Sequence, residues 1–148
     1  MKNLLFTIIL LASTYHISFA QDLKMRTQEF PDKEMKSQKK EIVKLVSQEI
    51  SDTLPQTIDK YTTLVSVSSV NTTLLYTFEI NTGSKSDESI KNEDRSRMKK
   101  AVTKGVCQSS RKFLEAGIST SYIYINAISK AHLFQFDIKQ KDCTSTTL

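Results

Sequence analysis

Few residues in this sequence have side chains suited to catalysis or metal binding. The two histidines are His16 and His132, and the two cysteines are Cys107 and Cys143. Nucleophilic triads and metal sites need several such groups converging on one point. No His-Glu-x-x-His, Gly-x-Ser-x-Gly or phosphate-binding glycine motif occurs. We therefore expect no metal site and no cofactor, and we interpret His132 as an ordinary surface or hydrogen-bonded residue.

Acidic residues offer one route to catalysis without histidine. Two carboxylates can hydrolyse a glycosidic bond, one as the acid and the other as the base or nucleophile. Asp59, Glu79 and Glu115 are candidates, but nothing in the sequence singles out a pair. A non-enzymatic protein is therefore the preferred interpretation, and a small hydrolase of envelope polymers is the alternative.

The first twenty residues have the pattern of a secretory signal peptide. Lys2 precedes an apolar run over 4–12, and small residues stand at Ser18 and Ala20 before Gln21. The run is too short for a transmembrane anchor, and a lipoprotein would carry a cysteine at position 21. We therefore expect cleavage after Ala20, no membrane anchor and a periplasmic or secreted protein.

The remaining chain is close to the commonest size of one domain. The expected organisation is a signal peptide over 1–20, a flexible segment over 21–31, a single domain over 32–143 and a flexible tail over 144–148. An even number of cysteines in an exported chain favours a disulfide between Cys107 and Cys143. A redox-active pair would usually show Cys-x-x-Cys spacing, which this chain lacks.

The spacing of apolar residues predicts the secondary structure. Apolar residues recur every three or four positions up to Pro55, which indicates a first helix. Apolar residues at every second position indicate strands. Gly105 falls inside the second predicted helix, which suggests close packing against a strand. The chain is predicted to be of the α+β class, with two helices on one face of a four-stranded, mainly antiparallel sheet. The expected elements are a helix over 32–54, strands over 63–70 and 74–80, a helix from 88 or 92 to 117, and strands over 119–125 and 131–138.

A basic cluster lies around the second predicted helix of this chain, whose formal net charge is +5. It is a candidate surface for an acidic partner, anionic lipid headgroups or a polyanion, and the alternative is a solvated helix face. Aromatic residues are not interleaved with it, so we expect no nucleic acid partner. The candidate residues are Arg95, Lys99, Lys100 and Lys104.

Tyr122 and Tyr124 alternate along the third predicted strand. If helices cover the opposite face of the sheet, these rings form an exposed aromatic binding strip. The alternative is cross-strand packing against Phe134 and Phe136.

A set of short motifs resembles small exported bacterial proteins, periplasmic or secreted, that have one cysteine pair. This resemblance implies an exported location and a disulfide, and it supplies no active-site residue. The residues that carry it are Leu54-Pro55-x-x-Ile58-Asp59-x-x-Thr62-x-Leu64, Val106-Cys107, Gly117, Tyr122-x-Tyr124 and Asp142-Cys143.

The leading functional hypothesis is an exported, non-enzymatic protein-binding domain of the bacterial envelope, acting as an accessory, inhibitor or immunity-type factor. Its expected partner is another envelope or secreted protein. Besides the hydrolase, a further alternative is a secreted virulence-associated protein that binds anionic host surfaces through the basic cluster over 95–112.

Overall fold

Ten helices and strands make up the part of the chain that the computed structural model describes, residues 32–144. The predicted signal peptide lies outside these residues. The elements are α1 (Asp32–Ser51), β1 (Gln56–Thr57), β2 (Thr62–Val70), β3 (Thr73–Ile80), α2 (Asp87–Lys91), α3 (Ser96–Ser109), α4 (Arg111–Glu115), β4 (Ser119–Asn126), β5 (His132–Ile138) and α5 (Gln140–Thr144).

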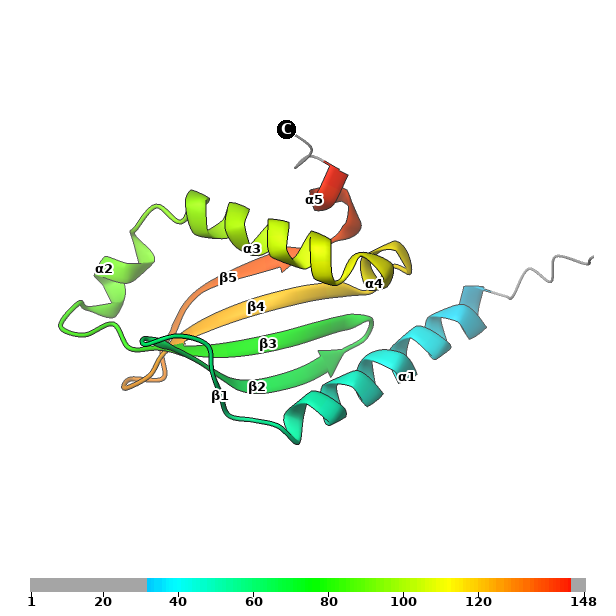
Figure 1. Cartoon of the computed structure of the whole chain (residues 1–148), viewed down its shortest axis with the longest axis horizontal. Helices are drawn as coiled ribbons and strands as arrows, with labels where there is room; N and C mark the ends of the chain where they lie inside the picture. The colour runs from blue at the N-terminus through cyan, green and yellow to red at the C-terminus, as the bar shows by residue number, and fades with distance from the viewer. Residues whose placement is uncertain (1–31, 145–148) are drawn as a thin grey trace, which may run out of the picture.

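The strands form one mixed sheet in the order β1-β2-β3-β4-β5 (Figure 1). The pairs β2–β3 and β4–β5 are antiparallel hairpins, as the sequence predicts. Asn71 has a left-handed backbone (φ 55°) in the turn between β2 and β3, a conformation that asparagine adopts more readily than most residues. The α+β class is thus confirmed.

The sheet is mainly antiparallel, as predicted, with three antiparallel pairs among its four, but its strand number and the pairing of β3 with β4 differ from the prediction. The two-residue strand β1 adds a fifth strand, and the central strands β3 and β4 run parallel. The helices between them return the chain to the end of the sheet at which β3 begins, where the amide of Ser119 donates to the carbonyl of Thr72 at 3.0 Å. A connection that contains a helix is the usual link between parallel neighbours.

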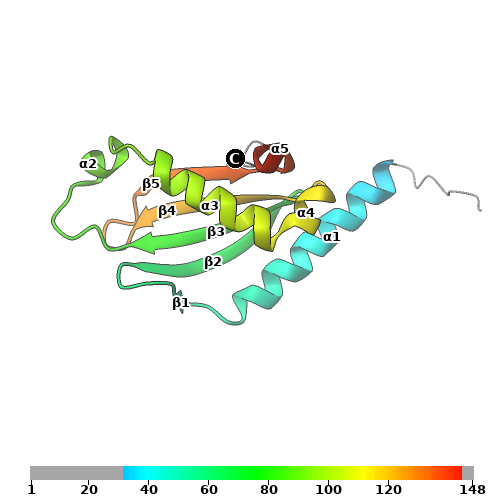
Figure 2. The ribbon, with the colours of Figure 1, turned by 45° about the horizontal axis from the view of Figure 1, so that its top comes forward.

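Helices α1 and α3 both lie on one face of the sheet, as predicted (Figure 2). Helix α1 is fixed to β2 by a hydrogen bond from Ser51 Oγ to the carbonyl oxygen of Val67, at 2.9 Å. No helix within residues 32–144 is long and apolar enough to span a membrane.

The second predicted helix is divided into α2, α3 and α4. The Ser86 hydroxyl accepts a hydrogen bond from the Ser89 amide and caps α2. Asp94 accepts one from the Ser96 amide at 2.9 Å, at the start of α3. The side-chain cap at Ser86 satisfies a backbone donor that would otherwise lack a partner, so α2 begins there. The N-cap position of α3 is Arg95, which has no side-chain cap, and Asp94 lies one residue before it. Gly117 ends the region with a φ of +78°.

Gly105 lies inside α3 without the close packing that the sequence suggests. A Cβ added there meets no atom within 4 Å outside its own helix. Alanine is a better helix former than glycine, so we expect Gly105→Ala to raise the free energy of unfolding by about 1 kcal/mol. Urea denaturation measures this change. Gly117→Ala is the contrasting variant, because its positive φ makes alanine destabilising, and a loss of stability in Gly105→Ala would contradict the prediction.

Candidate functional site

A row of aromatic rings runs across β3, β4 and β5 on the face that carries the helices. Tyr124 lies at its centre, with its ring centroid 5.1 Å from Phe78 and 4.7 Å from Phe134. Tyr76 and Tyr122 continue the row, with centroids 5.1 Å apart. The rings therefore form the floor against which the helices pack.

The predicted exposed strip of Tyr122 and Tyr124 is therefore wrong. Tyr124 is 4% exposed, and Tyr122 is partly buried against Val106 and Ile138 of the core. Alternation in a strand separates two faces but does not tell which one the helices cover. The packing alternative, with Phe134 and Phe136, is the observed arrangement.

Burial changes the ionisation of these tyrosines. It raises the pKa of Tyr124 to about 12. Burial also raises the pKa of Tyr122 to about 12, with smaller contributions from the neighbouring Tyr76 and Tyr124. The phenols are held neutral because the ionised form would lose its hydration.

This burial predicts a loss of stability in alkali. The pKa values of Tyr122 and Tyr124 in the folded protein lie above the ordinary value of 10. The contribution of these two neutral phenols to the free energy of unfolding is therefore fully present below pH 10 and is lost as the pH rises toward about 12. A pH titration of tyrosinate absorbance should show a late phase that shrinks in Tyr122→Phe and Tyr124→Phe. Complete titration of the folded protein near pH 10 would contradict this expectation.

Arg95 does not belong to an exposed basic surface. Its guanidinium carbon lies 4.3 Å from the centre of the Phe134 ring, and the group donates a hydrogen bond to the carbonyl of Ile90. Such stacking on an aromatic face is typical of arginine. Arg95 is therefore a structural residue that covers the end of the aromatic row.

Lys99, Lys100 and Lys104 are exposed on α3, as the prediction of a basic surface requires. The sequence contains no acidic residue over 96–112. The three ion pairs found within residues 32–144 involve none of these lysines. The outer side of α3 is therefore a positively charged surface.

The candidate catalytic residues do not converge on one site. Glu79 accepts a hydrogen bond from Lys130 Nζ at 2.5 Å, and Asp59 accepts one from the amide of Tyr61 at 2.8 Å. Glu115 lies before β4, at the opposite end of the sheet. His132 is exposed at the start of β5. Within residues 32–144 no three histidine, cysteine or acidic side chains are grouped as metal ligands.

Two shallow hollows contain none of these candidates. One, of about 430 Å³, lies between α1 and β2, and the other, of about 370 Å³, lies between the α4–β4 connection and the start of α5. The first is lined by Lys44, Ser47, Gln48, Ser51, Asp52, Val67, Ser68 and Ser69; the second by Leu114, Gly117, Ile118, Ser119, Lys139, Gln140 and Lys141.

The apolar surface of α1 is wider than the part that the sheet covers. Val43 is fully buried. Met35, Ile42 and Leu45 are 40%, 44% and 56% exposed. These three lie seven and three positions apart, so they share one side of the helix. We call them the α1 apolar face. Exposed apolar groups gathered in this way often mark an interaction site.

One residue of the α1 apolar face departs from the helical spacing of the apolar residues in the sequence. Met35 and Ile42 fit the spacing of the buried residues of α1, whereas Leu45 lies beside Val46 and outside that spacing. Leu45 therefore widens the apolar side of α1 beyond the buried stripe, and only together with Met35 and Ile42 does it form an exposed apolar group.

A second group of exposed apolar residues lies at the other end of the molecule. Ile58 and Tyr61 lie in the β1–β2 connection, and Ile128 lies in the β4–β5 turn. They are 54%, 56% and 80% exposed. These residues lie in separate loops rather than on one helix face, so they serve below as a matched control.

The fold has relatives among solved structures of bacterial proteins. A Pseudomonas aeruginosa protein proposed to be secreted has a TM-score of 0.65 at 13% identity, covering 74% of this chain and 96% of its own. The type 2 secretion system pilotin EpsS of Vibrio vulnificus has a TM-score of 0.62 at 13% identity, with 75% and 96% covered. The type II pilotin AspS of Vibrio cholerae has a TM-score of 0.60 at 13% identity, with 76% and 98% covered. At these identities the likeness establishes the fold.

The family assignment follows from the sequence itself. The model of the family described as "Domain of unknown function (DUF8479)" matches residues 33–134. This match covers more than half of the chain, which therefore belongs to that family. No curated protein matches the sequence significantly.

Proposed function

We propose that this chain is an exported, non-enzymatic domain that binds another protein of the bacterial envelope through the α1 apolar face. The observation that carries the proposal is the exposure of Met35, Ile42 and Leu45 on one side of a regular helix. A helix whose apolar side chains remain in water gains stability when a partner covers them, at roughly 25 cal/mol per Å² of apolar surface.

The fold supports the choice of partner class. Two of the structural relatives are pilotins of secretion systems, and a third was proposed to be secreted. The sequence of this chain begins with the pattern of an export signal. The likeness of the fold to pilotins and the predicted signal peptide both favour an envelope protein as the partner. We therefore propose that the chain acts as an accessory protein in the periplasm or at the cell surface.

Export with cleavage after Ala20 is part of this proposal. The expected result is an exported protein that begins at Gln21, with or without cyclisation of that residue. Intact mass spectrometry of the protein recovered from the exporting cell measures its first residue. A recovered chain that still begins at Met1 would contradict the assignment of the signal peptide.

Binding can be tested by affinity capture from a detergent extract of the bacterial envelope. The bait is the exported protein, and the test variant is Ile42→Glu/Leu45→Glu, which places two charges on the α1 apolar face. We expect the unchanged protein to retain one specific envelope protein and the variant to lose it, because a carboxylate at an apolar contact has no partner.

The matched control is Ile58→Glu/Ile128→Glu, which makes the same change at exposed apolar positions outside the α1 apolar face. This variant should retain the partner. Equal retention by all three proteins would show that the α1 apolar face is not the binding surface. Circular dichroism checks that each variant is folded.

A further inference from the structure

The outer side of α3 carries a row of positive charges. Arg97, Lys100 and Lys104 are spaced by three and four residues, and Arg111 follows at the start of α4. All four are exposed. The core-facing side of α3 instead contains Thr103, Val106 and Cys107. We call these four basic residues the α3 basic face.

No negative charge on the same segment neutralises this face. Residues 96–112 include no aspartate or glutamate, and Lys112 is exposed next to Arg111, whereas Lys99 interacts electrostatically with Asp137 of β5. The ion pairs found in the described part of the chain lie on other elements. A local excess of positive charge therefore remains available to an external partner.

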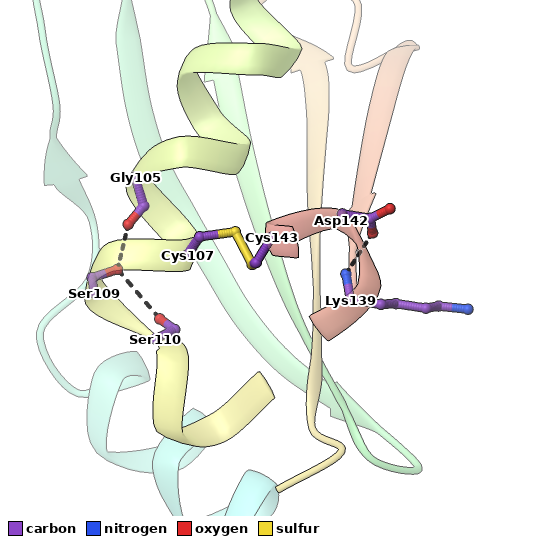
Figure 3. The surroundings of a disulfide bond; sticks show 7 residues. All are labelled: Gly105, Cys107, Ser109, Ser110, Lys139, Asp142 and Cys143. Atoms are coloured by element: carbon purple, nitrogen blue, oxygen red, sulfur yellow. Dashed lines mark hydrogen bonds between the residues drawn. A yellow bond between two sulfur atoms is a disulfide. The ribbon is translucent and has the colours of Figure 1, made fainter. Parts of the chain in front are cut away.

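The charged helix is also held in a fixed position. Val106 is 3% exposed in the core, and Cys107 is joined to Cys143 by the disulfide (Figure 3). The helix that carries Arg97, Lys100 and Lys104 belongs to the layer of helices seen in Figure 1. Docking through this face would not require the helix to form or to move.

We propose that the α3 basic face docks the domain on an anionic phospholipid membrane. A membrane fits because Arg97, Lys100 and Lys104 lie in a row on α3, a helix of 14 residues about 21 Å long, and Arg111 follows at the start of α4. Arg97, Lys100, Lys104 and Arg111 line neither of the two hollows described above. A plane of negative headgroups offers many equivalent partners to long, separate basic side chains.

This role goes beyond the binding of a protein partner. The α1 apolar face and the α3 basic face belong to different helices on the same side of the sheet. The membrane contact would bring the domain and its protein partner to one surface. It requires no residue of the α1 apolar face, so the two proposals can fail separately.

Sedimentation with lipid vesicles tests the inference. The exported protein, recovered from the cell after processing, is mixed with vesicles of phosphatidylcholine or of phosphatidylcholine with phosphatidylglycerol. We expect binding to the anionic vesicles that weakens as salt screens the charges. The Lys100→Glu/Lys104→Glu variant should bind about tenfold more weakly or worse, since each basic residue near an anionic membrane contributes to binding.

The matched control is Lys33→Glu/Lys40→Glu, which makes the same charge change at exposed positions on α1. It should bind nearly as well as the unchanged protein. Equal binding to neutral vesicles, or equal losses in the two variants, would overturn the proposal. Retention on heparin without binding to anionic vesicles would overturn it as well, because it would assign the face to an acidic polymer.

Discussion

Tyr124→Ala is expected to lower the free energy of unfolding by about 3 to 5 kcal/mol, the usual cost of removing a large buried ring. Tyr124 is 4% exposed and contacts Phe78, Phe134 and Phe136. Its removal would leave a cavity at the centre of the aromatic row, where three strands contribute side chains. A small domain has only about 5 to 15 kcal/mol of stability in total, so this change threatens folding itself.

Chemical denaturation followed by circular dichroism measures this loss. Tyr61→Ala is the control, because Tyr61 is 56% exposed in a loop. Its effect should be well below that of Tyr124→Ala, as is usual for surface substitutions. Similar losses in the two variants would contradict the packing of Tyr124 in the core.

Removal of the disulfide is the other large expected effect. The bond between Cys107 of α3 and Cys143 of α5 closes a loop with a sequence separation of 36 (Figure 3). In the unfolded chain such a link removes conformational freedom corresponding to about 4 kcal/mol. Cys107→Ala/Cys143→Ala should therefore unfold at a markedly lower denaturant concentration than the oxidised protein.

Reduction provides an independent measurement of the same effect. A reducing agent should lower the denaturation midpoint of the unchanged protein and leave that of the double variant where it was. If the double variant and the oxidised protein had equal midpoints, the disulfide would contribute nothing to folding.

Local sequence patterns predicted much of the fold, because the periodicity of helices and strands is determined by residues that are close together in the sequence. Helical spacing and Pro55 located α1, and alternation located the two antiparallel hairpins. The predicted export signal and the two cysteines led to the prediction of the disulfide, which the structure contains. The parallel pairing of β3 with β4 depends on where the helical connection returns the chain, and no local pattern reports that.

The candidate surfaces were harder to predict because burial is a tertiary property. The alternation of Tyr122 and Tyr124 is the same whether helices or water cover that face of the sheet. The sequence predicts Arg95 to be a surface charge, because nothing in it shows that Phe134 lies beneath the guanidinium group in the folded protein. Lys100 and Lys104 were predicted correctly as exposed, since an amphipathic helix directs such residues outward.

Site-specific photocrosslinking in the living cell tests the central claim most directly. A photoreactive residue is placed at Ile42 in the α1 apolar face, or at Ile128 in the β4–β5 turn as the control. Our account predicts that irradiation joins the protein to one envelope protein from position 42 and gives no such product from position 128. A product from position 128 alone, or no product from position 42 in exported and folded protein, would contradict protein binding through the α1 apolar face.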